Sequence, residues 1–314
     1  MQVIHGYDHV PRNARGAVLA IGNFDGVHRG HQALLAHARD IAKQSKSAAS
    51  QILAGVLAFE PHPRTLFQPE RPHFRLTTIT QRIALFKQYG MDLTVVLPFD
   101  RNLANLTAEH FVERVLVAGL GVKHAVVGYD FRFGKGREGS PTSLVAAGKE
   151  MGFGVTVIES VADGGEVVSS SAVRAELAQG DVEGAAKLLG HRWCVAGEVK
   201  GGAHRGTGMG YPTANIGLPS GAALAHGIYA VKVHVGAHVH DGAAYLGTRP
   251  TFDNGDAVLE TFLLDFQGDL YGKTIELEFV GFIRGDRKFE STEALVKQMD
   301  RDVAKTREML AKVT

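Results

Sequence analysis

Two histidines near the start of the chain, His28 and His31, lie three residues apart where one sequence pattern gives way to another. Residues 17–21 form a short apolar run typical of a strand buried on both faces, and residues 22–26 have the composition of a turn. Beyond His31, apolar residues recur at helical spacing. A glycine-containing turn before a helix leaves backbone N–H groups free at the positive helix end. Because both imidazoles can also donate hydrogen bonds to phosphoryl oxygens, the segment indicates a phosphate site.

A second glycine-rich segment lies at residues 201–210 and is followed by Thr213 and Asn215. Closely spaced glycines let backbone N–H groups approach a polyphosphate. The side-chain oxygens of Thr213 and Asn215 are ligands that a hard cation such as Mg²⁺ prefers, together with nucleotide phosphates. The chain therefore has two separate segments that suit nucleotide phosphates.

The first half of the chain alternates strand and helix patterns, which is the signature of a parallel α/β sheet. We expect strands at residues 17–21, 52–59, 93–97 and 125–127, and helices over residues 80–89 and after Thr107. Ligands of open α/β sheets lie beyond the carboxyl ends of the strands. The loops that follow these strands should therefore converge on one crevice.

Three loops of the first half carry polar or aromatic side chains that could act with the two histidines. Residues 59–63 form the first loop, and residues 128–134, which suit a ribose or a flavin edge, form the second. In the third loop, serine hydroxyls and an arginine precede a helix, and together with the helix amides they make an anion site. The same serines could equally cap that helix. Both roles are compatible, since a capping serine can face a ligand.

From Trp193 onward the chain has short strands separated by glycine-rich turns, which indicates an all-β domain. Cys194 is expected at a buried strand position, and the domain boundary near residue 186. A final helix over residues 291–313 should pack on the barrel. The expected strands cover residues 193–199, 227–235, 238–246, 258–266 and 274–283, and the expected helix face contains Leu295, Met299, Val303 and Leu310.

Composition narrows the class of protein further. The formal net charge is +1, and no basic tract is dense enough to predict nucleic-acid binding. With one cysteine, an intramolecular disulfide is excluded, and a reducing compartment is expected. The N-terminal segment lacks the apolar core of a signal peptide, and no run reaches membrane-spanning length. We therefore expect a cytoplasmic protein with no membrane association.

Residues 22–31, read as GNFDGVHRGH, resemble the HxGH signature of the nucleotidylyltransferase superfamily. The ten-residue form resembles, more narrowly, the N-terminal motif of the bacterial bifunctional riboflavin kinase/FAD synthetases. Loops 59–63 and 128–134 match further segments of that family, and residues 212–215 match the PTAN core of its riboflavin kinase motif. The resemblance implies an α/β Rossmann-like nucleotidylyltransferase domain at residues 1–186 and an all-β riboflavin kinase barrel with a C-terminal helix at residues 187–314.

The resemblance also implies an activity and a set of site residues. The kinase domain would phosphorylate riboflavin to FMN with ATP and Mg²⁺, and the first domain would adenylylate FMN to FAD. The implied catalytic residues are His28, His31, Arg174 and Glu260, the last activating the riboflavin 5′-hydroxyl. The implied ATP- and phosphate-binding residues are Gly22, Asn23, Phe24, Gly30, Ser170, Ser171, Gly201, Gly206, Gly208 and Gly210. The implied flavin-binding residues are Phe59, Pro61, His62, Asp130, Phe131, Arg249 and Arg284, and the implied metal ligands are Thr213 and Asn215.

Three positions in the kinase half depart from the family pattern. Thr207 stands where arginine is frequent, Tyr245 where asparagine is usual, and Asp286 where glutamate is usual. Alternatives therefore include an FAD synthetase that receives FMN from elsewhere, a different adenylyl- or cytidylyltransferase fused to a barrel, and a flavin-binding sensor without turnover. The sequence makes no prediction of the oligomeric state.

Overall fold

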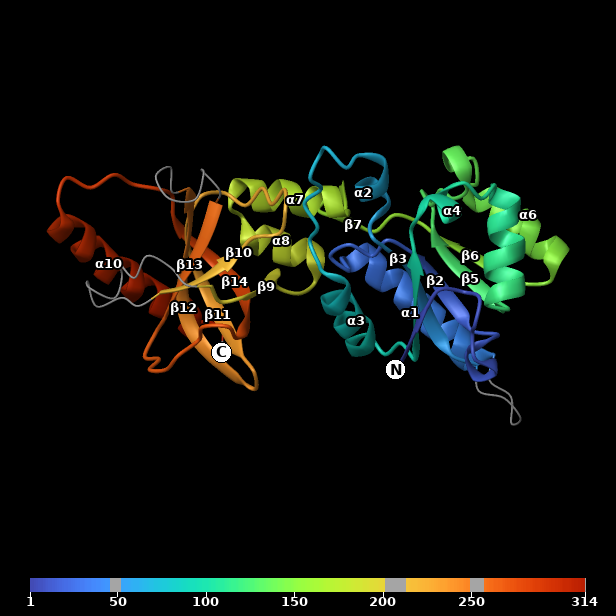
Figure 1. The fold of residues 1–314 in the computed structure, drawn as a ribbon, viewed down its shortest axis with the longest axis horizontal. Coiled ribbons are helices and arrows are strands. Elements are labelled where there is room, and N and C mark those ends of the chain that lie inside the picture. The colour runs from blue at the N-terminus through green and yellow to red at the C-terminus, as the bar shows by residue number, and fades with distance from the viewer. Residues whose placement is uncertain (46–51, 201–212, 249–256, 314) are drawn as a thin grey trace. The chain divides into compact units, whose positions relative to one another are not determined.

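The structure is a computed structural model that describes residues 1–45, 52–200, 213–248 and 257–313 (Figure 1). The chain forms two compact units. Unit 1 contains residues 1–73 and 77–169, and unit 2 contains residues 74–76 and the chain from residue 170. The family resemblance places the boundary between the adenylyltransferase and kinase domains at residue 186, and this boundary stays a prediction.

Unit 1 is built on a six-stranded sheet in the order β1-β4-β3-β2-β5-β6. Every pairing in this sheet is parallel. Its strands are β1 (Gln2–His5), β2 (Val18–Gly22), β3 (Ala54–Glu60), β4 (Leu93–Pro98), β5 (His124–Gly128) and β6 (Gly154–Ile158), and β7 (Ala162–Asp163) pairs with β8 (Glu166–Val167) outside it. The α/β prediction for this half is confirmed.

Helices pack on both faces of the unit 1 sheet. Side chains of β2 alternate: Val18 and Ala20 pack with α1 and α3, whereas Leu19 and Ile21 pack with η2 and α6. Strand β2 is therefore buried on both faces, as its apolar run predicts. The helical segments are α1 (Arg29–Gln44), α2 (Pro63–Phe67), α3 (Ile79–Gln88), α4 (Arg101–Ala104), α5 (Ala108–His110), α6 (Pro141–Met151), the 3-10 turns η1 (Arg12–Ala14) and η3 (Lys135–Arg137), and the π-helix η2 (Phe111–Gly119).

The strand order of unit 1 indicates at which edge of the sheet ligands of such folds bind. From β2 the chain adds β3 and then β4 on one side, and it later returns to place β5 and β6 on the other side. Such a reversal leaves a crevice beyond the carboxyl ends of the strands on either side of it, here β2 and β5. The histidine pair lies where the chain passes from β2 into α1, residues 59–62 span the end of β3 and the start of its loop, and residues 130–131 follow β5. The topology therefore gathers these predicted site segments at one edge of the sheet.

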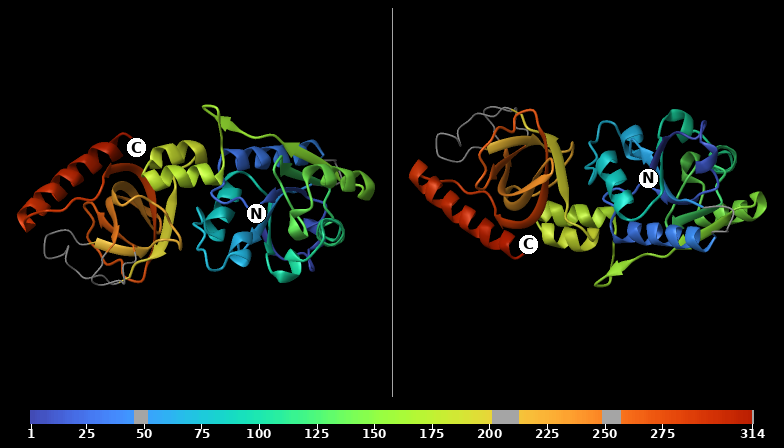
Figure 2. Two further views of the ribbon diagram at one scale, coloured as in Figure 1. Left: turned by 90° about the horizontal axis from the view of Figure 1, so that it is seen from above. Right: turned by 90° about the horizontal axis from the view of Figure 1, so that it is seen from below.

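Unit 2 is a strongly curved antiparallel sheet in the order β10-β13-β12-β11-β14-β9. The edge strands meet where the N–H of Lys200 donates to the carbonyl of Asn215 at 2.9 Å, so the sheet approaches a closed barrel with α10 along its outside (Figure 2). Its elements are α7 (Ser170–Gln179), α8 (Val182–Leu189), β9 (Cys194–Glu198), β10 (Thr213–Gly217), β11 (Gly227–Val235), β12 (His238–Thr248), β13 (Ala257–Leu263), β14 (Thr274–Arg284) and α10 (Thr292–Ala311).

The core of unit 2 centres on Trp193. Its indole stacks on Phe279 at 4.9 Å between ring centroids, meets Phe74 edge-on at 5.7 Å, and donates to the carbonyl of Leu76 at 3.0 Å. Buried apolar residues of α7 and α8 join the same core. Cys194 lies on a strand, β9, as predicted, but it is half-buried and not fully buried. Burial, followed by the neighbouring Glu276, raises the pKa of its thiol.

The buried side of α10 differs from the predicted apolar face. Its buried residues are Asp302, Thr306 and Leu310, whereas Leu295, Met299 and Val303 of the predicted face are only half-buried. Asp302 tolerates burial because it pairs with Arg284 of β14, with the two charged groups 2.8 Å apart. An apolar pattern cannot predict a helix that docks partly through an ion pair.

Several elements have no counterpart among the sequence predictions. They include β1, β6, β10 and α6, the short helices α2 and α4, and the β7–β8 pair. Residues 2–5, read as QVIH, lack the alternation of apolar and polar residues that indicates a strand, and β1 is exposed or half-exposed along its length. It pairs in parallel with β4 at the edge of the sheet. Among the helices of the described residues, none has the length and apolar character needed to cross a membrane.

Candidate functional site

The turn between β2 and α1 holds the two histidines against each other. His28 is the N-cap of α1, and its Nδ1 atom accepts a hydrogen bond from the N–H of His31 at 3.3 Å. The two rings stack with centroids 3.7 Å apart. Gly30 makes this packing possible, because a Cβ atom there would lie 3.1 Å from the His28 ring. The pair therefore sits at the positive end of a 16-residue helix, where an anion is favoured.

His31 is held in its neutral form. Burial lowers its pKa well below the usual value, and the neighbouring His28 and Arg82 lower it further. Its Nδ1 atom is buried and has no hydrogen-bond partner among the described residues. A buried polar atom without a partner is rare in proteins unless it serves a function or meets a ligand or water.

The backbone of this turn adopts conformations that bulky residues rarely take. Phe24 has φ +53° and Val27 has φ +44°, and both side chains are fully buried. The left-handed region costs such residues about 1–3 kcal/mol each, so it persists only where packing enforces it. Phe24 packs edge-on against Phe86 of α3 and contacts the His31 ring at 5.1 Å between centroids. Packing of the turn thus fixes the backbone that leads into the histidine pair.

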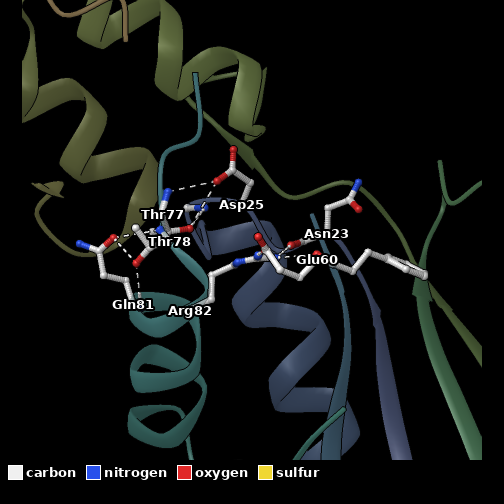
Figure 3. Close-up of polar contacts among 9 residues, drawn as sticks. Asn23, Asp25, Glu60, Thr77, Thr78, Gln81 and Arg82 are labelled. Atoms are coloured by element: carbon white, nitrogen blue, oxygen red, sulfur yellow. Dashed lines mark hydrogen bonds and ion pairs between the residues drawn. The ribbon is translucent and has the colours of Figure 1, made fainter. Parts of the chain in front are cut away.

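Arg82 of α3 joins two of the predicted site loops, although no sequence pattern indicates that this arginine belongs to the site. Its side chain is 1% exposed. The guanidinium donates to the carbonyl of Asn23 at 2.6 Å and to that of Phe59 at 3.4 Å, and it pairs with the carboxylate of Glu60 (Figure 3). One buried arginine therefore fixes the turn after β2 relative to the end of β3. Its position on a helix, far from both loops in sequence, gave no local signal.

Asp25 and Thr77 form a second link between the turn and the segment before α3. The N–H of Thr77 donates to Asp25 Oδ1 at 3.1 Å, and the N–H of Gly26 donates to Thr77 Oγ1 at 2.9 Å (Figure 3). Thr78 and Gln81 then form a capping box that starts α3. These bonds bring Arg82, one turn into the helix, toward Asn23 and Glu60.

The remaining predicted residues of unit 1 lie at the end of β3 and on the loops after β3 and β5. Phe59 is buried and meets Phe99 edge-on at 5.8 Å, while His62 caps α2 and its ring lies 4.6 Å from that of His73. Phe131 stacks on Phe133 at 5.4 Å, and Asp130 is exposed. These loops therefore present aromatic surface next to polar groups, which suits an aromatic ligand with a polar chain.

Ser170, Ser171 and Arg174 belong to unit 2, in the first turns of α7. Arg174 donates from Nε to the carbonyl of Phe74 at 2.6 Å and from Nη1 to that of Ser170 at 3.0 Å. These bonds attach the segment 74–76 to α7. The role of this arginine toward a ligand stays a prediction.

The predicted kinase residues of unit 2 share one row of its sheet. Asn215 on β10 lies opposite Glu260 on β13, and Glu260 lies opposite Tyr245 on β12. The adjacent row of Ala214, Thr261 and Ala244 is buried in the barrel. Because directly opposed residues point to the same face and successive residues alternate, the row with Asn215 and Glu260 faces outward.

Thr213 lies two residues before Asn215, so its side chain points to the same outer face. The oxygens of Thr213, Asn215 and Glu260 are the donor type that Mg²⁺ prefers. Among the described residues, no group of three or more His, Cys, Asp or Glu side chains is placed to hold a metal. A metal at this face would therefore rely on hydroxyl and amide oxygens together with nucleotide phosphates.

Arg284, predicted to contact flavin, is held by α10. Its Nε atom lies 3.0 Å from both carboxylate oxygens of Asp302, and Gln298 donates to the same carboxylate at 2.9 Å. Six of the predicted or departing positions lie outside the described residues: Gly201, Gly206, Thr207, Gly208, Gly210 and Arg249.

Comparison with known proteins identifies both halves of the chain. The FAD synthetase family model matches residues 10–172, and the riboflavin kinase family model matches residues 189–310. A bifunctional riboflavin kinase/FMN adenylyltransferase of Escherichia coli (strain K12) is 40% identical over 306 residues, which are 97% of this chain and 96% of that protein. The chain belongs to this bifunctional family.

Further members and a solved structure agree with that assignment. The Pseudomonas fluorescens member is 39% identical over 312 residues, covering 99% of this chain and 98% of its own. A crystal structure described as a macrolide-efflux protein from Streptococcus pneumoniae has a TM-score of 0.81 at 28% identity and covers 98% of this chain and 99% of its own. The predicted family and fold class, an α/β nucleotidylyltransferase-like domain followed by a riboflavin kinase barrel with a C-terminal helix, are confirmed.

Arg82 offers a direct test of how this family member keeps His31 neutral. Replacing Arg82 by glutamine removes a positive charge that disfavours protonated His31, so we expect the pKa of His31 to rise. Arg82→Lys keeps the charge and should hold the pKa closer to that of the wild type. NMR titration of the imidazole ring protons measures both values, and a His31→Gln spectrum assigns the signal. The same His31 pKa in wild type and Arg82→Gln would contradict this account.

Proposed function

We propose that the chain phosphorylates riboflavin to FMN with ATP and then adenylylates FMN with a second ATP, producing FAD and pyrophosphate. The observation that carries this proposal is the match of both family models, in order, along one chain. Near-complete coverage of bifunctional relatives supports two active halves over a single FAD synthetase or an unrelated barrel. It also favours an enzyme over a flavin sensor.

In the adenylylation step, a phosphate oxygen of FMN attacks the α-phosphorus of ATP, and the bond to the pyrophosphate leaving group breaks. The FMN phosphate is already an anion, so the step needs no general base. Its barrier arises from charge on the phosphorus centre and the leaving group, which preorganised donors lower. We assign this role to His28, His31 and Arg174.

Binding of ATP in this half relies on backbone as well as side chains. The turn after β2 is held by Arg82 and by the buried Phe24, so its N–H groups have fixed directions. A neutral His31 can donate from one ring nitrogen to a phosphoryl oxygen while avoiding charge repulsion with His28. The residues that we propose for ATP in this half are Gly22, Asn23, Phe24, Gly30, Ser170 and Ser171, and those for flavin are Phe59, Pro61, His62, Asp130 and Phe131.

In the kinase step, the riboflavin 5′-hydroxyl attacks the γ-phosphorus of ATP and ADP leaves. Glu260 is half-buried on the outer row, and we assign to it the role of orienting that hydroxyl and accepting its proton. Thr213 and Asn215, on the same face, would hold Mg²⁺, which when bound offsets the phosphate charge. As ATP-binding residues of this half we propose the glycines at 201, 206, 208 and 210, and as riboflavin-binding residues Arg249 and Arg284.

A cytoplasmic location, predicted from the single cysteine and from the lack of a signal-peptide pattern, stays a prediction.

Product analysis tests the proposed function directly. We expect purified protein with riboflavin, ATP and Mg²⁺ to form FMN first and FAD later, as separated by chromatography. With FMN in place of riboflavin, we expect FAD and pyrophosphate in equal amounts. Conversion of FMN without any conversion of riboflavin would contradict the kinase assignment and leave the adenylyltransferase.

His28→Asn separates the catalytic role of His28 from its structural role. Asparagine is a favourable N-cap residue, so α1 should keep its start while the imidazole is lost. We expect FAD formation from FMN to fall about 10²-fold, the usual effect of losing one transition-state donor. Riboflavin phosphorylation by the same sample should remain at the wild-type rate. Equal loss of both activities would show that the variant disturbs more than one site.

Glu260→Gln should have the opposite effect. It removes the proton acceptor while keeping the shape of the side chain, so we expect riboflavin phosphorylation to fall about 10²-fold or more. FMN adenylylation, assayed in parallel, should persist. The matched control is Glu198→Gln, an exposed carboxylate at the end of β9. Wild-type kinase activity in Glu260→Gln would exclude the assigned role.

A further inference from the structure

The outer row of unit 2, which carries the proposed kinase residues, extends across the sheet to Arg284. Asn215 lies opposite Glu260, and Glu260 lies opposite Tyr245. Tyr245 lies opposite Ile228, and Ile228 lies opposite Arg284 at the end of β14. Because directly opposed residues share one face of a sheet, Arg284 lies on the same outward face as Glu260, with β12 and β11 between their strands.

Asp302 of α10 fixes the guanidinium of Arg284. Nε donates to both carboxylate oxygens at 3.0 Å, and Nη2 donates to Oδ2 at 2.8 Å. Nη1 donates to the carbonyl of Gly285 at 3.0 Å. A planar guanidinium paired in this way with a carboxylate is fixed in direction as well as in distance. Among the described residues, the second N–H of each terminal nitrogen has no acceptor, so both are left for a ligand.

The carboxylate of Asp302 is itself oriented by α10. Its side chain is 6% exposed, and Gln298, one helical turn earlier, donates from Nε2 to Oδ1 at 2.9 Å. Lys305 of the same helix donates from Nζ to the carbonyl of Ile283 at 2.8 Å. The helix therefore bonds to the side chain of Arg284 and to the backbone directly before it.

The segment after β14 adds an aromatic contact to the same arginine. The guanidinium of Arg284 lies 5.6 Å from the centre of the Phe289 ring, and that of Arg287 lies 5.8 Å from the same ring. Arg287 also donates to Oε1 of Gln298 at 3.5 Å. Carboxylate, carbonyl and ring together restrict the directions that the Arg284 side chain can take.

We propose that Asp302 is a positioning residue of the riboflavin kinase site, which holds Arg284 ready for riboflavin on the outward face that carries Glu260. This inference rests on the proposed kinase function and on the riboflavin contact proposed for Arg284. A mobile arginine has to be ordered when its ligand binds, and a fixed arginine avoids that cost. Because Arg284 is not assigned to the transferred phosphate, its ordering should favour the ground state and the transition state equally. Loss of such uniform binding raises KM and leaves kcat unchanged.

The test is a double-mutant cycle on the full-length protein with Asp302→Asn, Arg284→Met and the double variant. We expect Asp302→Asn to raise the KM for riboflavin about fivefold, the usual effect of ordering one side chain, with kcat within about twofold of wild type. Arg284→Met should raise this KM about tenfold or more, because it removes a charged hydrogen-bond donor. The double variant should match Arg284→Met, because Asp302 acts only through the arginine.

Thermal unfolding of the same variants separates positioning from a purely structural role. Asp302→Asn leaves the half-buried Arg284 without its carboxylate, so Tm should fall. The double variant removes both charges and should recover part of that loss. The KM for riboflavin should stay high in the double variant. A KM that recovers together with Tm would overturn the proposal.

A milder variant tests the same idea without removing a charge. Gln298→Met removes the bond that orients the Asp302 carboxylate and keeps the ion pair with Arg284. We expect a smaller rise in the KM for riboflavin, about twofold, with unchanged kcat. This variant decides the proposal if Asp302→Asn fails to fold, and a wild-type KM would then overturn it.

Asp265→Asn is the matched control. Asp265 also pairs with α10, because Arg307 donates to its two oxygens at 2.6 Å and 2.7 Å, but this pair is exposed and follows β13. Asparagine tolerates the φ of +56° at this position. We expect Asp265→Asn to leave the KM for riboflavin unchanged, and every variant to adenylylate FMN at the wild-type rate.

The outcomes distinguish this inference from the proposed function. A wild-type KM in Asp302→Asn, or the same rise in KM in Asp265→Asn, would overturn the role of Asp302 while the kinase activity stands. Quenching of riboflavin fluorescence measures affinity without turnover. Wild-type protein that binds riboflavin and does not phosphorylate it would overturn the proposed kinase activity, and the affinities of Asp302→Asn and wild type would then decide the role of Asp302.

Discussion

The candidate adenylyltransferase site depends on one buried guanidinium. Burying a charge is costly unless partners replace the lost water, and Arg82 finds them in the carbonyls of Asn23 and Phe59 and the carboxylate of Glu60. These partners belong to the turn after β2 and to the end of β3, so satisfying the charge also fixes these two segments relative to each other. The same charge helps to keep His31 neutral. Geometry and protonation at the histidine pair therefore share one cause.

The two units present their candidate sites in different ways because their sheets differ. In the parallel sheet of unit 1, both faces are covered, and chemistry is confined to the loops at the strand ends. In the antiparallel barrel of unit 2, one face fills the core, and the other points outward, where α10 covers part of it. Asn215, Glu260 and Tyr245 occupy that outer face in a single row. Kinase chemistry can thus be built on the strands themselves, which are more rigid than loops.

In unit 2, α10 does more than cover the barrel. Its buried residues include Asp302, which holds Arg284 at the end of β14. That arginine lies in the outer row of the sheet, so α10 fixes the β14 end of the row that also contains Glu260.

The sequence by itself determined the family, the α/β and all-β halves, and most of the strands and helices, because apolar periodicity and turn residues are local signals. It indicated the histidine pair because residue type and spacing within one turn suffice for that inference. It did not reveal Arg82, the positive φ of Phe24 and Val27, or the ion pair of Arg284 with Asp302. Each of these depends on groups far apart in the chain. Only the tertiary structure decided them, because the partner that satisfies a buried charge or a strained turn is set by packing and not by neighbouring residues.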